Sequence, residues 1–224
     1  MNHVLRTIFD TQCVIAEDGR TLSLQANLPE IEGEILQHWV RQIQPRCILE
    51  IGMAFGISSL FLCDAIANWD NVTYHIVDPF QSSAWSNIGR LNLARAGFAD
   101  RFNLIEARSE ISLPRLLDEG VRIDFAFVDG NHRFEHVMVD SFYLNKMLNV
   151  GGAIVFDDVD RPGVAKALAF LRTLPHYEEL PLPESIAGRR EMRIRRMMNV
   201  PQSRITAFRK VRTDGRPPHW YVEF

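Results

Sequence analysis

Hydrophobic runs alternate with amphipathic segments along most of the chain. Residues 30–43 carry apolar side chains at helical spacing, and Pro45 ends the predicted helix. A short apolar run at 47–51 then leads into a glycine-containing turn and a second apolar segment at 60–67. This order predicts a strand, a tight turn and a helix.

The same alternation continues to residue 156. Further strands are expected at Val72–Val77, Phe102–Glu106, Ile123–Val128, Ala153–Phe156, Tyr177–Leu182 and Ile205–Val211, and further helices at 87–96, 113–119 and Phe134–Leu148. Short apolar runs between amphipathic helices are typical of βαβ units, whose helices cover both faces of a parallel sheet. The predicted fold class is therefore α/β, with a doubly wound, mostly parallel seven-stranded sheet.

The expected domain organisation is simple. Residues 1–28 form an N-terminal extension with a possible hairpin turning at Asp18-Gly19, which could cover the ligand site or form a dimer contact. Residues 29–224 form one domain, in which residues 188–203 are a basic insertion or lid. A homo-oligomer is a further possibility, because the apolar segment 220–224 could dock at a subunit interface.

Composition narrows the class of protein. The 224 residues are 46% hydrophobic, with 25 Lys+Arg against 28 Asp+Glu, which argues against a disordered or histone-like chain. No apolar run approaches the roughly 20 residues that span a bilayer, so no membrane partner is expected. Three cysteines without metal-ligand spacing, and the lack of a secretory leader pattern, predict a cytoplasmic protein.

The near-neutral total hides an uneven distribution of charge. Residues 1–188 hold 15 basic and 25 acidic side chains, whereas residues 189–224 hold 10 and 3. A run of like charges can simply be a solvated surface. The functional interpretation is a lid or partner surface that attracts an acidic acceptor, such as a phosphorylated or nucleotide-linked sugar.

Candidate chemistry lies just after the strands, because ligands of such sheets bind beyond the carboxyl ends. Gly52 and Gly56 follow the first strand of the sheet, but Ala54 breaks the dinucleotide pattern and no phosphate-loop lysine follows. A tight turn without a ligand remains an alternative. Asp78 follows the next strand, where an acid can accept hydrogen bonds from a ribose or cap a helix.

Five segments at the strand ends form one ordered set. They are Glu50-Ile-Gly-Met-Ala-Phe-Gly56, His75-Ile-Val-Asp-Pro79, Arg108-Ser-Glu110, Phe127-Val-Asp-Gly-Asn-His132 and Gly151-Gly-Ala-Ile-Val-Phe-Asp-Asp158. The set resembles the S-adenosylmethionine motifs of class I methyltransferases, over about residues 30–175. It is most similar to the small metal-dependent O-methyltransferases of the macrocin and catechol types.

The resemblance implies a role for each matching residue. Three residues, Glu50, Gly52 and Gly56, would line the methionine half of S-adenosylmethionine, and Ser58 would add a hydroxyl there. Asp78 would hold the ribose, and Ser109 and Glu110 would flank the adenine. Asp129 would lie at both the cofactor and the metal. For Ser109-Glu110 a helix N-cap is the alternative.

Three acids suggest a metal beside this cofactor. Asp129, Asp157 and Asp158 end two strands expected to be neighbours, and converging carboxylates repel unless a cation joins them. All-oxygen ligands favour Mg²⁺ or Ca²⁺, with Mg²⁺ preferred for catalysis. The macrocin type uses carboxylates throughout, whereas the catechol type has Asn at the position of Asp158. Helix caps without a metal remain the alternative.

A histidine completes the predicted chemistry. His132 follows Asp129 by three residues, where the macrocin type has a histidine base, and a neutral imidazole can accept a hydroxyl proton near pH 7. His136, one helical turn later, could serve instead. The predicted activity is methyl transfer from S-adenosylmethionine to a hydroxyl of a small molecule or sugar, with Asp129 and His132 as catalytic residues.

Three alternatives use the same residues differently. A metal-independent methyltransferase would need only the cofactor site, and a non-catalytic cofactor-binding scaffold would not need the acids or His132. An RNA-binding or RNA-methylating protein could use the basic end. The segment Asp129-Gly-Asn-His132 argues against nucleic acid, because base-methylating enzymes carry a proline- and aromatic-containing segment there.

Overall fold

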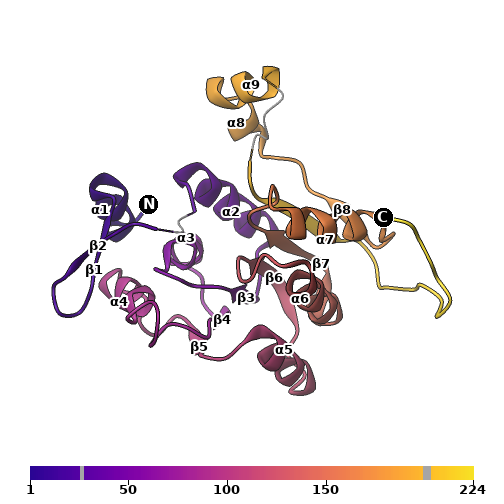
Figure 1. The fold of residues 1–224 in the computed structure, drawn as a ribbon, viewed down its shortest axis with the longest axis horizontal. Helices are drawn as coiled ribbons and strands as arrows, with labels where there is room; N and C mark the ends of the chain where they lie inside the picture. Colours follow the sequence, from indigo (N-terminus) through magenta and orange to yellow (C-terminus); the bar gives the residue numbers. More distant parts are fainter. Residues whose placement is uncertain (26–27, 199–202) are drawn as a thin grey trace.

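The computed structural model describes residues 1–25, 28–198 and 203–224. Within them, seven strands form one sheet in the order β5-β4-β3-β6-β7-β9-β8 (Figure 1). The strands are β3 (Cys47–Ile51), β4 (Thr73–Val77), β5 (Asn103–Ile105), β6 (Ile123–Val128), β7 (Leu148–Phe156), β8 (Tyr177–Glu179) and β9 (Thr206–Lys210). Neighbours from β5 to β7 are parallel, and β9 is antiparallel to β7 and β8. The predicted α/β fold is confirmed.

Helices cover both faces of this sheet. Along β6, Phe125 and Phe127 belong to one buried cluster, and Ala126 and Val128 belong to the other. The first cluster includes α2 (Glu30–Ile43), α3 (Ile57–Ala65) and α4 (Ile88–Arg95), and the second includes α5 (Ser109–Asp118), α6 (Phe134–Met147) and α7 (Pro162–Thr173). Burial on both faces explains why the strands read as continuous hydrophobic runs.

The chain order places the site at the middle of the sheet. From β3 the chain runs outward through β4 to β5, and then returns to the other side of β3 as β6. A crevice therefore opens between the loops that follow β3 and β6. The parallel register pairs the last residues of β3, β6 and β7, so Gly52, Asp129 and Asp157 follow in one row at this edge.

The N-terminal extension packs against α3 and α4. The predicted hairpin is present as β1 (Cys13–Ile15) and β2 (Thr21–Ser23). The helix before it, α1 (His3–Thr11), is an element that the sequence analysis did not predict. Asn2 caps that helix by accepting a 3.0 Å hydrogen bond from the Leu5 N–H. Arg95 of α4 donates to the Ile15 carbonyl at 2.6 Å.

The basic segment contains two short helices, α8 (Glu184–Ala187) and α9 (Arg190–Met197), which project from the body of the molecule in Figure 1. Met192 and Ile186 are buried, whereas Ile194 and Met197 are exposed. Residues 199–202 of the predicted 188–203 lid lie outside the described residues. Across the described part of the chain, no helix is long and apolar enough to cross a membrane.

Gly52 provides a test of how closely the loops after β3 and β6 approach. Its φ is +90°, and a Cβ there would lie 2.1 Å from the Asp129 carbonyl oxygen. Gly97 has a similar φ of +82° with open space around it. Gly97→Ala should therefore lower the free energy of unfolding by about 1 kcal/mol, from backbone strain alone. Gly52→Ala should lower it by about 3 kcal/mol or more, because the backbone must also move.

Urea denaturation of the two variants measures this difference. Equal losses for Gly52→Ala and Gly97→Ala would contradict the close contact between the two loops.

Candidate active site

A cavity of about 460 Å³ opens at the carboxyl edge of the sheet, between the loops after β3, β4 and β6. Its lining includes five of the predicted cofactor-binding residues: Gly52, Asp78, Ser109, Glu110 and Asp129. The other lining residues are Ile51, Ala54, Val77, Pro79, Phe80, Trp85, Arg108, Gly130, Asn131, Arg133 and His136. This mixture of apolar walls and a few polar groups suits a small polar ligand.

Asp78 holds the glycine turn in place. Its side chain is 2% exposed, and one carboxylate oxygen accepts hydrogen bonds from the Met53 and Ala54 N–H groups, both at 2.9 Å. The other oxygen accepts from the Phe80 N–H at 2.8 Å. A single buried carboxylate thus ties the end of β4 to the turn after β3, a structural role beyond the capping role that the sequence suggested.

Glu50 lies behind the turn and does not line the cavity. It is fully buried and accepts hydrogen bonds from the hydroxyls of Ser58, Ser59 and Tyr74, with Ser59 at 2.6 Å. Burial raises the pKa of Glu50 to about 7, against the opposing effect of the three hydroxyls. Glu50 therefore anchors the start of α3. The sequence analysis did not identify Ser59 and Tyr74 as partners of Glu50. Tyr74 lies on the neighbouring strand β4 and Ser59 on α3, and no local sequence pattern marks either residue as a partner of this acid.

Gly56 also lies outside the lining of the cavity. A Cβ at Gly56 would come within 3.0 Å of the Gly89 carbonyl oxygen on α4, so this glycine permits close packing between the turn and that helix. Gly52 lines the cavity, and Gly56 and Ser58 support the turn from behind.

Asp140 is a buried acid that the sequence analysis missed. It lies on α6, is 1% exposed and accepts a hydrogen bond from the Ser109 hydroxyl at the rim of the cavity. Burial raises its pKa to about 6, while Ser109 and the nearby His136 act in the opposite direction. Its spacing of four residues from His136 on a predicted helix is the signal that could have revealed it.

A histidine and two acids meet next to the cavity. His132 Nε2 lies 3.4 Å from Asp129 Oδ1 and 3.1 Å from Asp158 Oδ2. Burial raises the pKa of Asp129, and its contact with His132 opposes that effect. His136 instead lines the cavity itself. His132 thus lies between Asp129 and Asp158, two of the three acids that the sequence singled out.

Asp157, the third predicted acid, points one oxygen into the interior. Its Oδ1 is buried without a hydrogen-bond partner, and burial with the neighbouring Asp129 charge raises the Asp157 pKa to about 8. An orphaned carboxylate oxygen in an all-oxygen set suits a hard divalent cation. Across residues 1–25, 28–198 and 203–224, however, no three His, Cys, Asp or Glu side chains are grouped tightly enough to hold a metal ion.

Two arginines contact Asp158, another of the three predicted metal ligands. Arg161 Nε lies 3.1 Å from Asp158 Oδ2, and Arg204 Nη2 forms an ion pair with Asp158 Oδ1. Asp158 itself has a left-handed backbone, with φ of +51°. Arg204 comes from the basic end of the chain, and its contact with the acids was not predicted.

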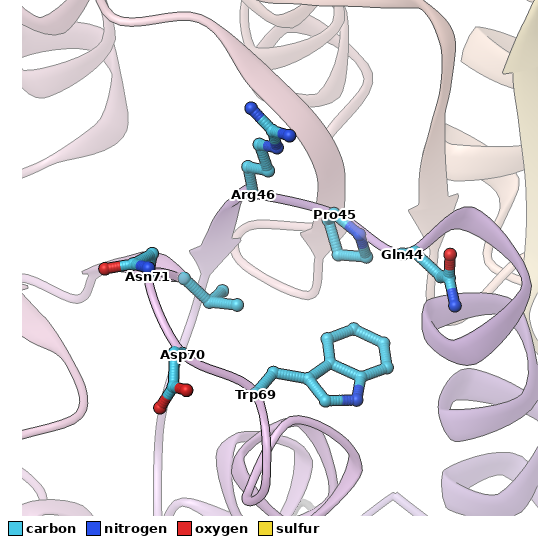
Figure 2. Close-up of a pocket in the computed structure, with 7 residues that line it drawn as sticks. Gln44, Pro45, Arg46, Trp69, Asp70 and Asn71 are labelled. Carbon is cyan, nitrogen blue, oxygen red and sulfur yellow. The ribbon is translucent and has the colours of Figure 1, made fainter.

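A second hollow of about 600 Å³ lies at the opposite edge of the sheet, around Trp69, Pro45 and Gln44 (Figure 2). It is formed by the segments that enter β3 and β4, at the amino ends of these strands. It contains none of the predicted site residues. Since ligands of open α/β sheets bind at the carboxyl ends, the first cavity is the candidate active site.

Comparison with known proteins shows that this chain is similar to methyltransferases. A family model described as a methyltransferase domain matches residues 49–159, from within β3 to just beyond β7, a range that includes the acid cluster. A catechol O-methyltransferase of Mycobacterium tuberculosis is 29% identical over 168 residues, covering 70% of this chain and 73% of that protein. Catechol O-methyltransferase B of Danio rerio is 26% identical over 156 residues, covering 68% of this chain and 57% of that protein.

A solved structure extends the likeness to most of the fold. An O-methyltransferase from Bacillus cereus, in complex with SAH, superposes with a TM-score of 0.68 at 18% identity. The superposition covers 94% of this chain and 92% of that one.

Asp140 makes the stability of the protein depend on pH. Because its folded-state pKa of about 6 exceeds the ordinary 3.8, the native state binds this proton more tightly, and stability falls as pH rises from about 4 through 6. Asp140→Asn removes that penalty. It should raise the free energy of unfolding by on the order of 2 kcal/mol at pH 8 and much less at pH 4.

Urea unfolding at pH 4, 6 and 8 measures the effect, with the exposed Asp118→Asn as the matched control. A gain from Asp140→Asn that is the same at all three pH values would refute the assignment.

Proposed function

Because the chain belongs to the class I S-adenosylmethionine-dependent O-methyltransferases of the catechol type, we propose that it methylates a hydroxyl group of a small molecule or sugar. The observation that carries the proposal is the cluster of His132, Asp129 and Asp158 directly beside a cavity whose glycine turn is fixed by Asp78. One site thus offers a proton acceptor next to a ligand pocket.

S-adenosylmethionine would occupy the 460 Å³ cavity and supplies a methyl group activated by its sulfonium charge. Gly52 would let the backbone approach the methionine half, and Asp78 Oδ1, which accepts one hydrogen bond from Phe80, has room to accept another from a ribose hydroxyl. Ser109 and Glu110 would flank the adenine. Glu50, Gly56 and Ser58 would act by holding the turn and the start of α3.

His132 is the proposed general base. Its Nε2 lies at the carboxylates, so it can accept the proton of an acceptor hydroxyl held there, and the Asp129 and Asp158 charges would stabilise the resulting imidazolium. The bound cofactor would supply the methyl group to the deprotonated oxygen, and its sulfur would keep the electron pair of the sulfur–methyl bond. The chain's part in that step is alignment of the two groups.

Asp129, Asp157 and Asp158 would hold a divalent cation, with Mg²⁺ as the expected ion. A bound cation would supply positive charge that lowers the pKa of the acceptor hydroxyl. The orphaned Asp157 Oδ1 supports this part of the proposal. A metal-independent transfer is the second candidate, because Arg161 and Arg204 already bring positive charge to Asp158.

The acceptor is proposed to be acidic. Arg161 and Arg204 lie at the acid cluster, and Arg189 and Arg193 belong to the basic segment that precedes Arg204. The positive charges of these arginines would attract a phosphorylated, carboxylated or nucleotide-linked molecule, which is negatively charged. A catechol is the other acceptor class to test, because the similar proteins named above methylate it by their descriptions.

Removing His132 tests the chemical step. His132→Ala should lower kcat about 100-fold or more while the dissociation constant for SAH changes less than about 3-fold, because the ring takes the proton but does not hold the cofactor. Transfer of a radiolabelled methyl group to catechols and to acidic sugars gives kcat, and calorimetry gives SAH affinity. The exposed His38→Ala, on α2, is the matched control. Loss of activity in His136→Ala but not in His132→Ala would transfer the role of base to His136.

Removing metal tests the second part of the proposal. EDTA should abolish transfer and Mg²⁺ should restore it, and Asp158→Ala should remove the Mg²⁺ response while SAH still binds. Transfer at full rate in EDTA would favour the metal-independent candidate.

A further inference from the structure

Arg204 joins the basic end of the chain to the acid cluster. It lies two residues before β9, and its guanidinium reaches Asp158 Oδ1 through Nη2. Its Nε also lies 3.7 Å from Asp160 Oδ1. Arg204 therefore meets two acids of the loop that follows β7, although it is 46 residues away from Asp158 in the chain.

The backbone of Arg204 is held from both sides. Its N–H donates to Glu32 Oε1 of α2 at 2.6 Å, and Glu32 is 3% exposed. Its carbonyl accepts a 3.0 Å hydrogen bond from the Val159 N–H. The next residue, Ile205, is buried in the core. The main chain at Arg204 is thus fixed between α2 and the loop after β7.

The side chain is less confined than its backbone. It is 41% exposed, and its contacts in the site are ion pairs with Asp158 and Asp160. A guanidinium cannot lose its proton in a protein, so the charge beside Asp158 is permanent. To leave Asp158 the guanidinium would have to rotate into solvent, and its Nε, which is buried, would move with it while the backbone stays in place.

This placement conflicts with a metal on the same oxygens. Asp158 Oδ1 faces Arg204, and Oδ2 faces Arg161 and His132, so both oxygens of the third candidate ligand already meet nitrogen atoms. Asp158 Oδ1 meets Arg204 as an ion pair without a hydrogen bond, and Asp157 Oδ1 likewise has no hydrogen-bond partner. A divalent cation and a guanidinium would repel each other there.

We propose that Arg204 is a tethered cation that competes with the divalent metal for Asp158, so that metal binds only when this side chain turns away. The inference rests on the metal-assisted form of the proposed function. By linkage, whatever draws Arg204 toward solvent also tightens metal binding. An acidic acceptor that pairs with Arg204 would therefore prepare the site for its own reaction.

Direct binding of Mn²⁺ tests the competition without using activity. The spectrum of free Mn²⁺ is followed by electron paramagnetic resonance during titration into the full chain with SAH present. R204Q, which removes the charge, should bind Mn²⁺ about 10-fold tighter or more than the unaltered protein. R204K, which keeps a positive charge, should stay within about 3-fold.

R161Q is the matched control, because Arg161 also contacts Asp158 but is 58% exposed and lies on the adjacent turn. It should change Mn²⁺ affinity by less than about 3-fold, as expected for an exposed ion pair. R209Q, a substitution on β9, is a control for the loss of one positive charge at a position away from Asp158. If R204Q does not fold, as judged by thermal unfolding, R204M takes its place, since it keeps the aliphatic stem.

Unchanged or weaker Mn²⁺ binding in R204Q, or no Mn²⁺ binding in any variant, would overturn the proposal. Equal tightening in R161Q and R204Q would also overturn it, because a general loss of positive charge would then be sufficient. The affinity for SAH distinguishes a failure of the proposed function from a failure of the proposed role of Arg204. If SAH does not bind to any variant, the proposed function fails, whereas the ratio of Mn²⁺ affinities still decides the role of Arg204.

Discussion

The carboxylate of Asp78 is the contact on which the geometry of the site depends. It accepts backbone hydrogen bonds from Met53 and Ala54 and so joins the end of β4 to the turn after β3. Ala54 has a positive φ of 47°, a conformation that needs such support in a residue other than glycine. With the turn fixed, Gly52 can lie against the Asp129 carbonyl, and the cavity and the acid cluster become neighbours. A buried acid therefore organises the pocket even before any ligand interacts with it.

The remaining buried acids follow from the same arrangement. Parallel register places Gly52, Asp129 and Asp157 in one row, so carboxylates gather where three strands end. Burial raises the pKa of Asp129 and Asp157, and the structure opposes the accumulated charge with His132, Arg161 and Arg204. Such a concentration of shifted pKa values in a cleft is characteristic of functional sites.

The sequence predicted the sheet well and the supporting contacts poorly, for physical reasons. Strand periodicity and the residues after each strand are local signals, so the seven strands and the position of Asp78 and Asp129 could be predicted. Helix α7 (Pro162–Thr173) was missed although proline at its first turn is a start signal. The Ser109–Asp140 and Arg204–Asp158 contacts join distant segments, and no local pattern encodes them. Glu50 was predicted at the cofactor, but its burial against Tyr74 depends on how two strands pair.

The division of charge between the acidic body and the basic end has a structural basis in Arg204. Ten of the 25 basic residues lie in the last 36 positions, and one of them reaches across to the acids after β7. That residue is backbone-anchored to α2 through Glu32 and follows directly after the segment that carries α8 and α9. In the proposal made above, this single side chain would link charge at the acid cluster to charge on the acceptor. The basic end then contributes to the electrostatics of the reaction site itself, in addition to any attraction it exerts on an acidic acceptor in solution.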